Sequence, residues 1–175
     1  MPGSGWRPGM STCEKGKTAA ITGGSDGIGK ALTELLLASG ANVSTCARSQ
    51  EKLNILQQNN KDKPLLCITA DVSVYDDCKN FIEKTLQRFG EINILINNAG
   101  ISMRAELKDA DVSIFKKLIE INYLGTVYCT KLALNSLLKT KGTIVGVSSI
   151  AGYRGLPGRS GYSASKFATV TGRPH

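Results

Sequence analysis

A tyrosine and a lysine near the C-terminus have the spacing that acid–base chemistry requires. Tyr162 and Lys166 stand four positions apart in the segment YSASK, and residues at this spacing on a helix lie on the same face. An ammonium group beside a phenol stabilises the phenolate, so the phenol becomes a better proton donor. The pair therefore indicates a site that protonates a substrate. The alternative is that Tyr162 is a half-buried aromatic residue on a packing helix.

A glycine-rich segment near the other end of the chain indicates where a cofactor would bind. Residues 22–29 read TGGSDGIG and stand between an apolar run and a helical pattern. Glycines at such a turn allow positive φ, close approach of a pyrophosphate and tight packing of the helix on its strand. The helix N-terminus then offers free N–H groups to the phosphates. The segment predicts a dinucleotide-binding turn, and a purely structural turn is the alternative.

The end of the second apolar run indicates which dinucleotide fits. Residues 46–49 read CARS and include no acid, whereas NAD is usually held there by a carboxylate that accepts hydrogen bonds from the ribose 2′-hydroxyl. The guanidinium of Arg48 and the hydroxyl of Ser49 suit a 2′-phosphate instead. We therefore predict NADP(H) as the cofactor. The alternative is that Arg48 is a solvated charge at a strand end.

Composition excludes several other kinds of site. The only histidine among the 175 residues is His175. A Ser-His-Asp triad, a Cys-His dyad or a histidine-bearing metal site would therefore need the terminal residue. No metal is expected. The five cysteines are odd in number and lack a CxxC pair, which fits reduced thiols in the cytoplasm. No apolar run approaches the roughly 18 residues of a transmembrane segment.

The net charge of +8 is distributed unevenly. Residues 121–175 contain 7 basic residues and no acidic one. These charges are scattered among glycines and apolar residues without a Lys/Arg cluster, so nucleic acid is not expected as a partner. A nucleic-acid binder remains the third and weakest hypothesis, which salt-dependent retention on DNA would test.

Short apolar runs alternate with helical patterns from Lys17 onward, which is typical of an α/β domain with a parallel sheet. Residues 1–16, rich in Gly and Pro, are expected to be a flexible leader, and residues 17–175 a single dinucleotide-binding domain. The expected strands are Thr18–Thr22, Asn42–Ala47, Leu65–Thr69, Ile92–Asn97 and Thr143–Ser148. The expected helices are Ile28–Ser39, Gln50–Asn59, Tyr75–Phe89 and Asp111–Lys139, with a further helix beginning near Tyr162.

Five motifs in chain order resemble those of the short-chain dehydrogenase/reductase family, and the resemblance covers about residues 17–168. It implies a Rossmann fold, which is a doubly wound parallel α/β sheet. It also implies an oxidoreductase that transfers hydride between NADP(H) and a small-molecule carbonyl or alcohol substrate. The motifs are TGGSDGIG, Asn97-Asn98-Ala99-Gly100, the Asn122 of EINY, Ser149 and YSASK.

The resemblance also implies a role for individual residues. Tyr162 is the general acid, and Ser149 hydrogen-bonds the substrate oxygen. Lys166 binds the ribose hydroxyls of the nicotinamide and assists Tyr162, while Asn122 supports a water molecule that relays protons to Lys166. Asp71 is expected near the adenine. The full cofactor-binding set implied is Gly23, Ser25, Gly27, Ile28, Gly29, Arg48, Ser49, Asp71, Val72, Asn98, Ala99, Gly100, Tyr162 and Lys166.

The sequence departs from the family after the lysine. Members continue with two further strands, a helix and a substrate loop, whereas nine residues follow Lys166 here. We therefore expect a truncated chain with five strands, whose last strand is an exposed apolar edge. The final helix is expected to fray around Ala168, because β-branched residues, Gly and Pro follow. A homodimer or tetramer is expected for a complete chain. The alternative function is a catalytically impaired fragment that binds nucleotide or another subunit without turnover.

Overall fold

The computed structural model describes residues 14–171, so most of the expected leader lies outside the described residues. It contains a five-stranded sheet with the order β3-β2-β1-β4-β5, in which every pairing is parallel. The central strand is β1 (Thr18–Thr22), and all its residues are buried. From it, β2 (Asn42–Ala47) and β3 (Leu65–Thr69) lead to one edge, and β4 (Ile94–Asn97) and β5 (Thr143–Gly146) to the other. In such sheets a cleft forms at the carboxyl ends, where the strand order reverses.

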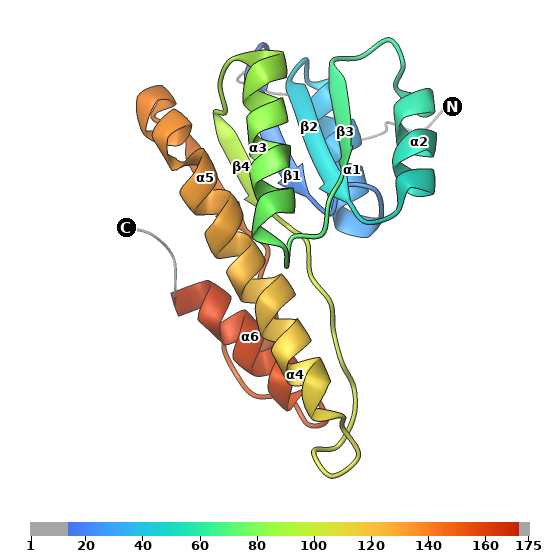
Figure 1. Cartoon of the computed structure of the whole chain (residues 1–175), viewed down its shortest axis with the longest axis vertical. Helices are drawn as coiled ribbons and strands as arrows, with labels where there is room; N and C mark the ends of the chain where they lie inside the picture. Colours follow the sequence, from blue (N-terminus) through green and yellow to red (C-terminus); the bar gives the residue numbers. More distant parts are fainter. Residues whose placement is uncertain (1–13, 172–175) are drawn as a thin grey trace, which may run out of the picture.

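Helices cover both faces of the sheet, as Figure 1 shows. On one face lie α1 (Gly27–Ala38) and α2 (Gln50–Asn59), and on the other lie α3 (Tyr75–Phe89) and α5 (Gly125–Thr140). This layering follows from the sequence, because a strand buried on both sides needs an amphipathic helix on each. The predicted doubly wound α/β class is confirmed.

Each face of the sheet has its own apolar core. The larger core packs α3 and α5 against the sheet and includes Phe81 and Leu95, both fully buried. The smaller core, under α1 and α2, includes Ile21 and Leu56. Burying one side chain of this size stabilises the fold by about 1.5–3 kcal/mol. These two cores hold the strand ends in fixed positions around the cleft.

The predicted bounds of β1, β2, β3, α2 and α3 agree with the structure, and a polar cap or a glycine marks some of them. The Ser49 side chain accepts a hydrogen bond from Lys52 N and begins α2, and Gly90, with φ +82°, ends α3. The first helix begins at Gly27 rather than Ile28, since the Asp26 side chain caps it through Gly27 N.

Two strand bounds differ from the prediction. The fourth strand begins at Ile94 rather than Ile92, where the Ile92 amide donates to Ser136 Oγ on α5. The fifth ends at Gly146 rather than Ser148, because the chain then turns into a short 3-10 helix at Ile150–Gly152. In the described sheet β5 is an edge strand, and its Val145 is 40% exposed.

The single long helix expected at Asp111–Lys139 is interrupted. It consists of α4 (Val112–Ile119), a π-helical turn at Glu120–Leu124 and α5. The interruption contains Asn122. The buried side chain of Asn122 forms hydrogen bonds with the backbone of Ile101. Apolar periodicity alone does not reveal such a turn, because the apolar positions continue on both sides of it.

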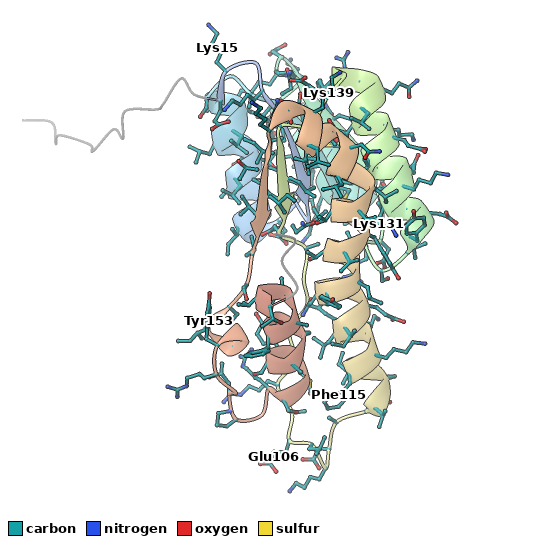
Figure 2. The ribbon with its side chains drawn as sticks, turned by 90° about the vertical axis from the view of Figure 1, so that its left-hand side faces the viewer. Lys15, Glu106, Phe115, Lys131, Lys139 and Tyr153 are labelled. Carbon is teal, nitrogen blue, oxygen red and sulfur yellow. The ribbon has the colours of Figure 1, made fainter. Side chains whose placement is uncertain are left out.

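The last described helix, α6 (Ser160–Thr171), lies beside α4 and beyond the carboxyl ends of the strands (Figure 2). The ring of Phe115 on α4 packs closely on it, since a Cβ added at Gly161 would lie 2.6 Å from that ring. The expected fraying near Ala168 was wrong. Thr169 Oγ1 donates to Asn122 O at 3.1 Å, and Thr171 Oγ1 donates to Phe167 O at 3.0 Å, so side-chain hydrogen bonds hold the last turn.

Within residues 14–171, none of the helices combines the length and apolar character that crossing a bilayer demands.

Candidate active site

A cleft of about 610 Å³ opens at the carboxyl ends of the strands, where the strand order reverses. It runs from the glycine turn before α1 to the Tyr162 face of α6. All of the sequence-predicted cofactor residues line it, namely Gly23, Ser25, Gly27, Ile28, Gly29, Arg48, Ser49, Asp71, Val72, Asn98, Ala99, Gly100, Tyr162 and Lys166.

At Gly23 and Gly29, contacts within the glycine turn leave no room for side chains. Gly23 has φ +72°, and its N–H donates to Cys46 O at 2.8 Å. A Cβ added at Gly29 would lie 2.3 Å from Gly23 O, so the first turn of α1 packs directly on the strand end. From β4, Asn98 Nδ2 donates to Thr22 O at 2.9 Å and ties the turn to the neighbouring strand.

The start of α1 carries a carboxylate and faces open space. Asp26 Oδ1 accepts a hydrogen bond from Gly27 N at 2.8 Å, while its Oδ2 pairs with the ammonium group of Lys52. The hydrogen bond from Lys52, with that from Gly27, holds the pKa of Asp26 below its ordinary value. Gly27 has φ +50°, and an added Cβ there would meet no atom within 4 Å. Gly27, Ile28 and Gly29 of this first turn line the cleft, and Asp26 engages the N–H of Gly27.

Two strand ends provide polar groups on the same side of the cleft. Arg48 and Ser49 follow β2, and Ser49 Oγ is engaged as the cap of α2. After β3, Asp71 Oδ1 accepts from the amide of Ser73 at 3.0 Å and from its hydroxyl at 2.6 Å. Burial acts to raise the pKa of Asp71, but the Ser73 hydrogen bonds outweigh it and Arg48 adds to them, so the pKa is lowered. Asp71 is therefore ionised at neutral pH.

On the opposite side, α6 presents Tyr162 and Lys166 to the cleft. Lys166 is only 5% exposed, and its Nζ donates to Val147 O at 2.8 Å. Burial lowers the pKa of Lys166. The guanidinium of Arg159 lies 6.0 Å from the Tyr162 ring centre and donates to Ser102 Oγ at 2.7 Å. A phenol and a buried ammonium group thus share one wall of the cleft, an arrangement suited to proton transfer.

Asn122 lies behind the cleft rather than in its wall. Its Oδ1 accepts from Ile101 N at 2.8 Å, and its Nδ2 donates to Ile101 O at 3.0 Å and Ser165 Oγ at 2.9 Å. A Cβ added at Gly100 would lie 3.1 Å from Asn122 Oδ1 and 3.3 Å from Lys166 Nζ. Both polar groups therefore gather around the backbone of Gly100, and Asn122 joins the loop after β4 to α6.

Ser149 also stands outside the cleft wall, which its neighbour Ser148 joins instead. The Ser149 side chain caps the short 3-10 helix, where Oγ accepts from Ala151 N at 3.2 Å. Ser148 Oγ donates to Lys166 O at 3.3 Å. The structure thus brings Tyr162 and Lys166 together in the cleft and leaves Ser149 and Asn122 beside it.

Several lining residues were absent from the sequence-predicted set. Cys46 is buried, and burial raises the pKa of its thiol, so it lines the cleft as a neutral group. Lys52 and Asp26 come from segments far apart in the sequence, so only folding reveals their pairing. The other unpredicted lining residues are Ala47, Ala70, Ile101, Ser102, Ile121, Val147 and Ser148.

The chain is similar to known proteins over nearly all of its described length. The short chain dehydrogenase family profile matches residues 17–171. The 11-beta-hydroxysteroid dehydrogenase-like 4A of Arabidopsis thaliana is 37% identical over 159 residues, which cover 89% of this chain and 53% of that protein. The 3-ketodihydrosphingosine reductase of Mus musculus is 39% identical over 161 residues, which cover 87% of this chain and 48% of that protein. The crystal structure of levodione reductase matches with a TM-score of 0.84 and 30% sequence identity. The match covers 90% of this chain and 63% of that one.

The chain spans about half the length of the curated relatives it matches. Over that span the likeness includes the sheet, the glycine turn before α1 and the helix with the tyrosine and lysine. Because the family profile extends across 17–171 and the fold agrees with a solved reductase, the chain belongs to the short-chain dehydrogenase family.

Proposed function

We propose that the chain binds NADP(H) in the cleft and transfers hydride between this cofactor and a carbonyl or alcohol substrate, with Tyr162 as the proton donor. The main supporting observation is that Tyr162 and Lys166 line the same cleft as the glycine turn. A bound nicotinamide supplies the hydride for the carbonyl carbon. The Tyr162 hydroxyl gives its proton to the carbonyl oxygen, so the carbonyl becomes an alcohol.

Three further residues assist this proton transfer in the proposal. Lys166 stabilises the phenolate that remains on Tyr162 and binds the ribose hydroxyls of the nicotinamide. Asn122 holds the Ile101 backbone beside Lys166 and supports the water molecule that returns a proton. Ser149 Oγ accepts a hydrogen bond from Ala151 N, which leaves its own O–H free to donate to the substrate oxygen.

The chain's own groups fit a dinucleotide. The combination of a left-handed backbone and open space at Gly27 lets a phosphate approach the first turn of α1, where the helix dipole favours negative charge. The preference for NADP(H) over NAD(H) rests on Arg48 and Ser49 at the end of β2, where no carboxylate is available for a ribose 2′-hydroxyl.

The substrate class is proposed only as a ketone or secondary alcohol. The names of two relatives suggest steroid and sphingoid ketones as the first compounds to try. The cytoplasmic location and the homodimer or tetramer expected from the sequence stay predictions.

The test is oxidation of NADPH by the purified chain with a panel of ketones, including an 11-oxosteroid and 3-ketodihydrosphingosine. Ketone-dependent loss of NADPH absorbance that requires Tyr162 supports the proposal. Enhanced NADPH fluorescence without oxidation of any ketone would favour the second hypothesis, a nucleotide-binding chain without turnover. Absence of any nucleotide binding would contradict both.

A further inference from the structure

An ion pair lies at the end of the cleft where α1 and α2 begin. Lys52, in the first turn of α2, extends its ammonium group to Asp26, which caps α1. Both residues line the cleft together with Arg48 and Ser49. The pair therefore joins the two helix starts that flank the site proposed for the adenosine half of the cofactor.

This pair is exposed and exchangeable. The side chain of Lys52 is 53% exposed and that of Asp26 is 71% exposed, and ion pairs in such positions contribute little to stability. A lysine is a point charge on a flexible stem, so its ammonium group can move to a nearby anion without any change in the backbone. A phosphate dianion competes well for it, because it carries more charge than one carboxylate.

The carboxylate of Asp26 is unfavourable for an incoming phosphate. Without Lys52, this negative charge would lose its cationic partner in the ion pair beside the start of α1, where phosphate groups are expected. With Lys52 present, this end of the cleft holds the cations Arg48 and Lys52 beside the carboxylates of Asp26 and Asp71. The position of Lys52 thus changes how strongly the region attracts a second phosphate.

We propose that Lys52 is a specificity-determining residue that leaves Asp26 and binds the ribose 2′-phosphate of NADP(H), next to Arg48 and Ser49. This inference rests on the proposed function. With NAD(H), which has a hydroxyl at that position, Lys52 stays paired with Asp26. Asp26 therefore sets how readily the lysine is released, and Lys52 supplies affinity that only the phosphorylated cofactor receives.

The quantity that tests this proposal is a selectivity ratio, the Kd for NADH divided by the Kd for NADPH, measured by nucleotide fluorescence without any need for turnover. Lys52→Met should lower the ratio about tenfold, mainly because it weakens the binding of NADPH. Lys52→Arg should keep it, because the cation is retained. Asp26→Asn should raise it about threefold, since asparagine preserves the cap of α1 while freeing the lysine.

The matched controls are Lys79→Met and Glu83→Gln, which remove the charges of an exposed ion pair within α3. They should leave the ratio unchanged. In the double variant Lys52→Met/Asp26→Asn, the asparagine should raise the ratio by less than it does in the wild-type background, because only the removal of the Asp26 charge remains and the release of the lysine is lost.

The outcomes separate this inference from the proposed function. If the wild type prefers NADPH and Lys52→Met has the same selectivity ratio, the role of Lys52 is overturned and the proposed function stands. The ion pair would then only join two helices. Equal affinity of the wild type for both nucleotides would overturn the NADP(H) preference and Lys52's role with it. Absence of binding by either nucleotide would overturn both proposals.

Discussion

Lys166 Nζ donates to the carbonyl oxygen of Val147 at 2.8 Å, so the cation on α6 is anchored to the chain just beyond β5. The ammonium group is thereby held inside the protein on the cleft side of the helix. Among residues 14–171 no carboxylate forms an ion pair with it, and a buried cation of this kind costs stability, so its position points to function rather than to folding.

The pH dependence of stability should reveal that cost. Burial lowers the pKa of Lys166 below its ordinary value of 10.5, so the unfolded chain binds this proton more tightly than the folded chain does. The penalty is present at neutral pH and disappears as pH rises from the lowered pKa toward 10.5. Relative to Lys166→Met, the wild type should therefore gain free energy of unfolding with rising pH, as urea titrations would measure. The exposed Lys131→Met is the control, and an identical pH slope in wild type and Lys166→Met would contradict the prediction.

Removing the phenolic hydroxyl should separate chemistry from binding. Tyr162→Phe keeps the ring that lies near Arg159 but deletes the proton, so turnover should fall by about two to four orders of magnitude. NADPH affinity should stay within about twofold of wild type. Stopped-assay product formation and fluorescence titration measure the two quantities. Tyr153→Phe, on an exposed residue, is the control, and wild-type turnover in Tyr162→Phe would refute the assignment.

Reversing the charge at the end of β2 should change the preferred cofactor. Arg48→Asp places a carboxylate where a ribose 2′-hydroxyl can donate to it, and it repels a 2′-phosphate. NADPH affinity should fall about a hundredfold while NADH affinity rises. Competition between the two nucleotides in one titration would measure the change. Unaltered relative affinities would remove Arg48 from the site.

A side chain at Gly29 should disrupt the cofactor turn. The Cβ of alanine would lie 2.3 Å from Gly23 O, so the turn and α1 must separate. We expect Gly29→Ala to destabilise the fold by about 1–3 kcal/mol and to abolish measurable nucleotide binding. Gly155→Ala is the control, because its Cβ meets nothing within 4 Å. Thermal unfolding and NADPH titration of both variants provide the comparison, and normal binding by Gly29→Ala would show that the turn tolerates a shift.

Loss of the Asn122 side chain should weaken the connection between the loop after β4 and α6. Asn122→Ala leaves the partly buried N–H and C=O of Ile101 without these partners and should cost about 2–4 kcal/mol of stability. Asn54→Ala, on the exposed face of α2, should cost less than about 0.5 kcal/mol. Denaturant midpoints measure both. Equal effects of the two substitutions would mean that the Ile101 contacts are replaced, for example by water.

The features that sequence reasoning predicted well are those set by local chemistry. The bounds of β1 and α2 agree because an apolar run ends at a glycine and a serine cap begins a helix. The residues predicted to bind a cofactor all line one cleft, since the glycine turn and the strand ends are read directly from the chain; their contact with a cofactor stays a prediction.

What the sequence did not reveal depends on contacts between distant segments. The pairing of Lys52 with Asp26 needs the folded chain, whereas the alternative that Ser149 acts as a cap at the strand end could be stated from the sequence. The persistence of α6 to Thr171 likewise depends on Thr169 donating to Asn122 O, a contact between residues 47 positions apart. Helix propensity alone underestimates such an end.

The π turn at Glu120–Leu124 has a consequence for how the two halves of the long helix can vary. An extra residue in one turn rotates everything after it by about 100° relative to an uninterrupted α-helix. The half before it, α4, is thereby oriented for α6, and the half after it, α5, for β4 and α3. Deleting one residue within the turn would restore a regular α-helix and misalign one half against its neighbours, so apart from Asn122 this segment should tolerate substitutions far better than changes in length.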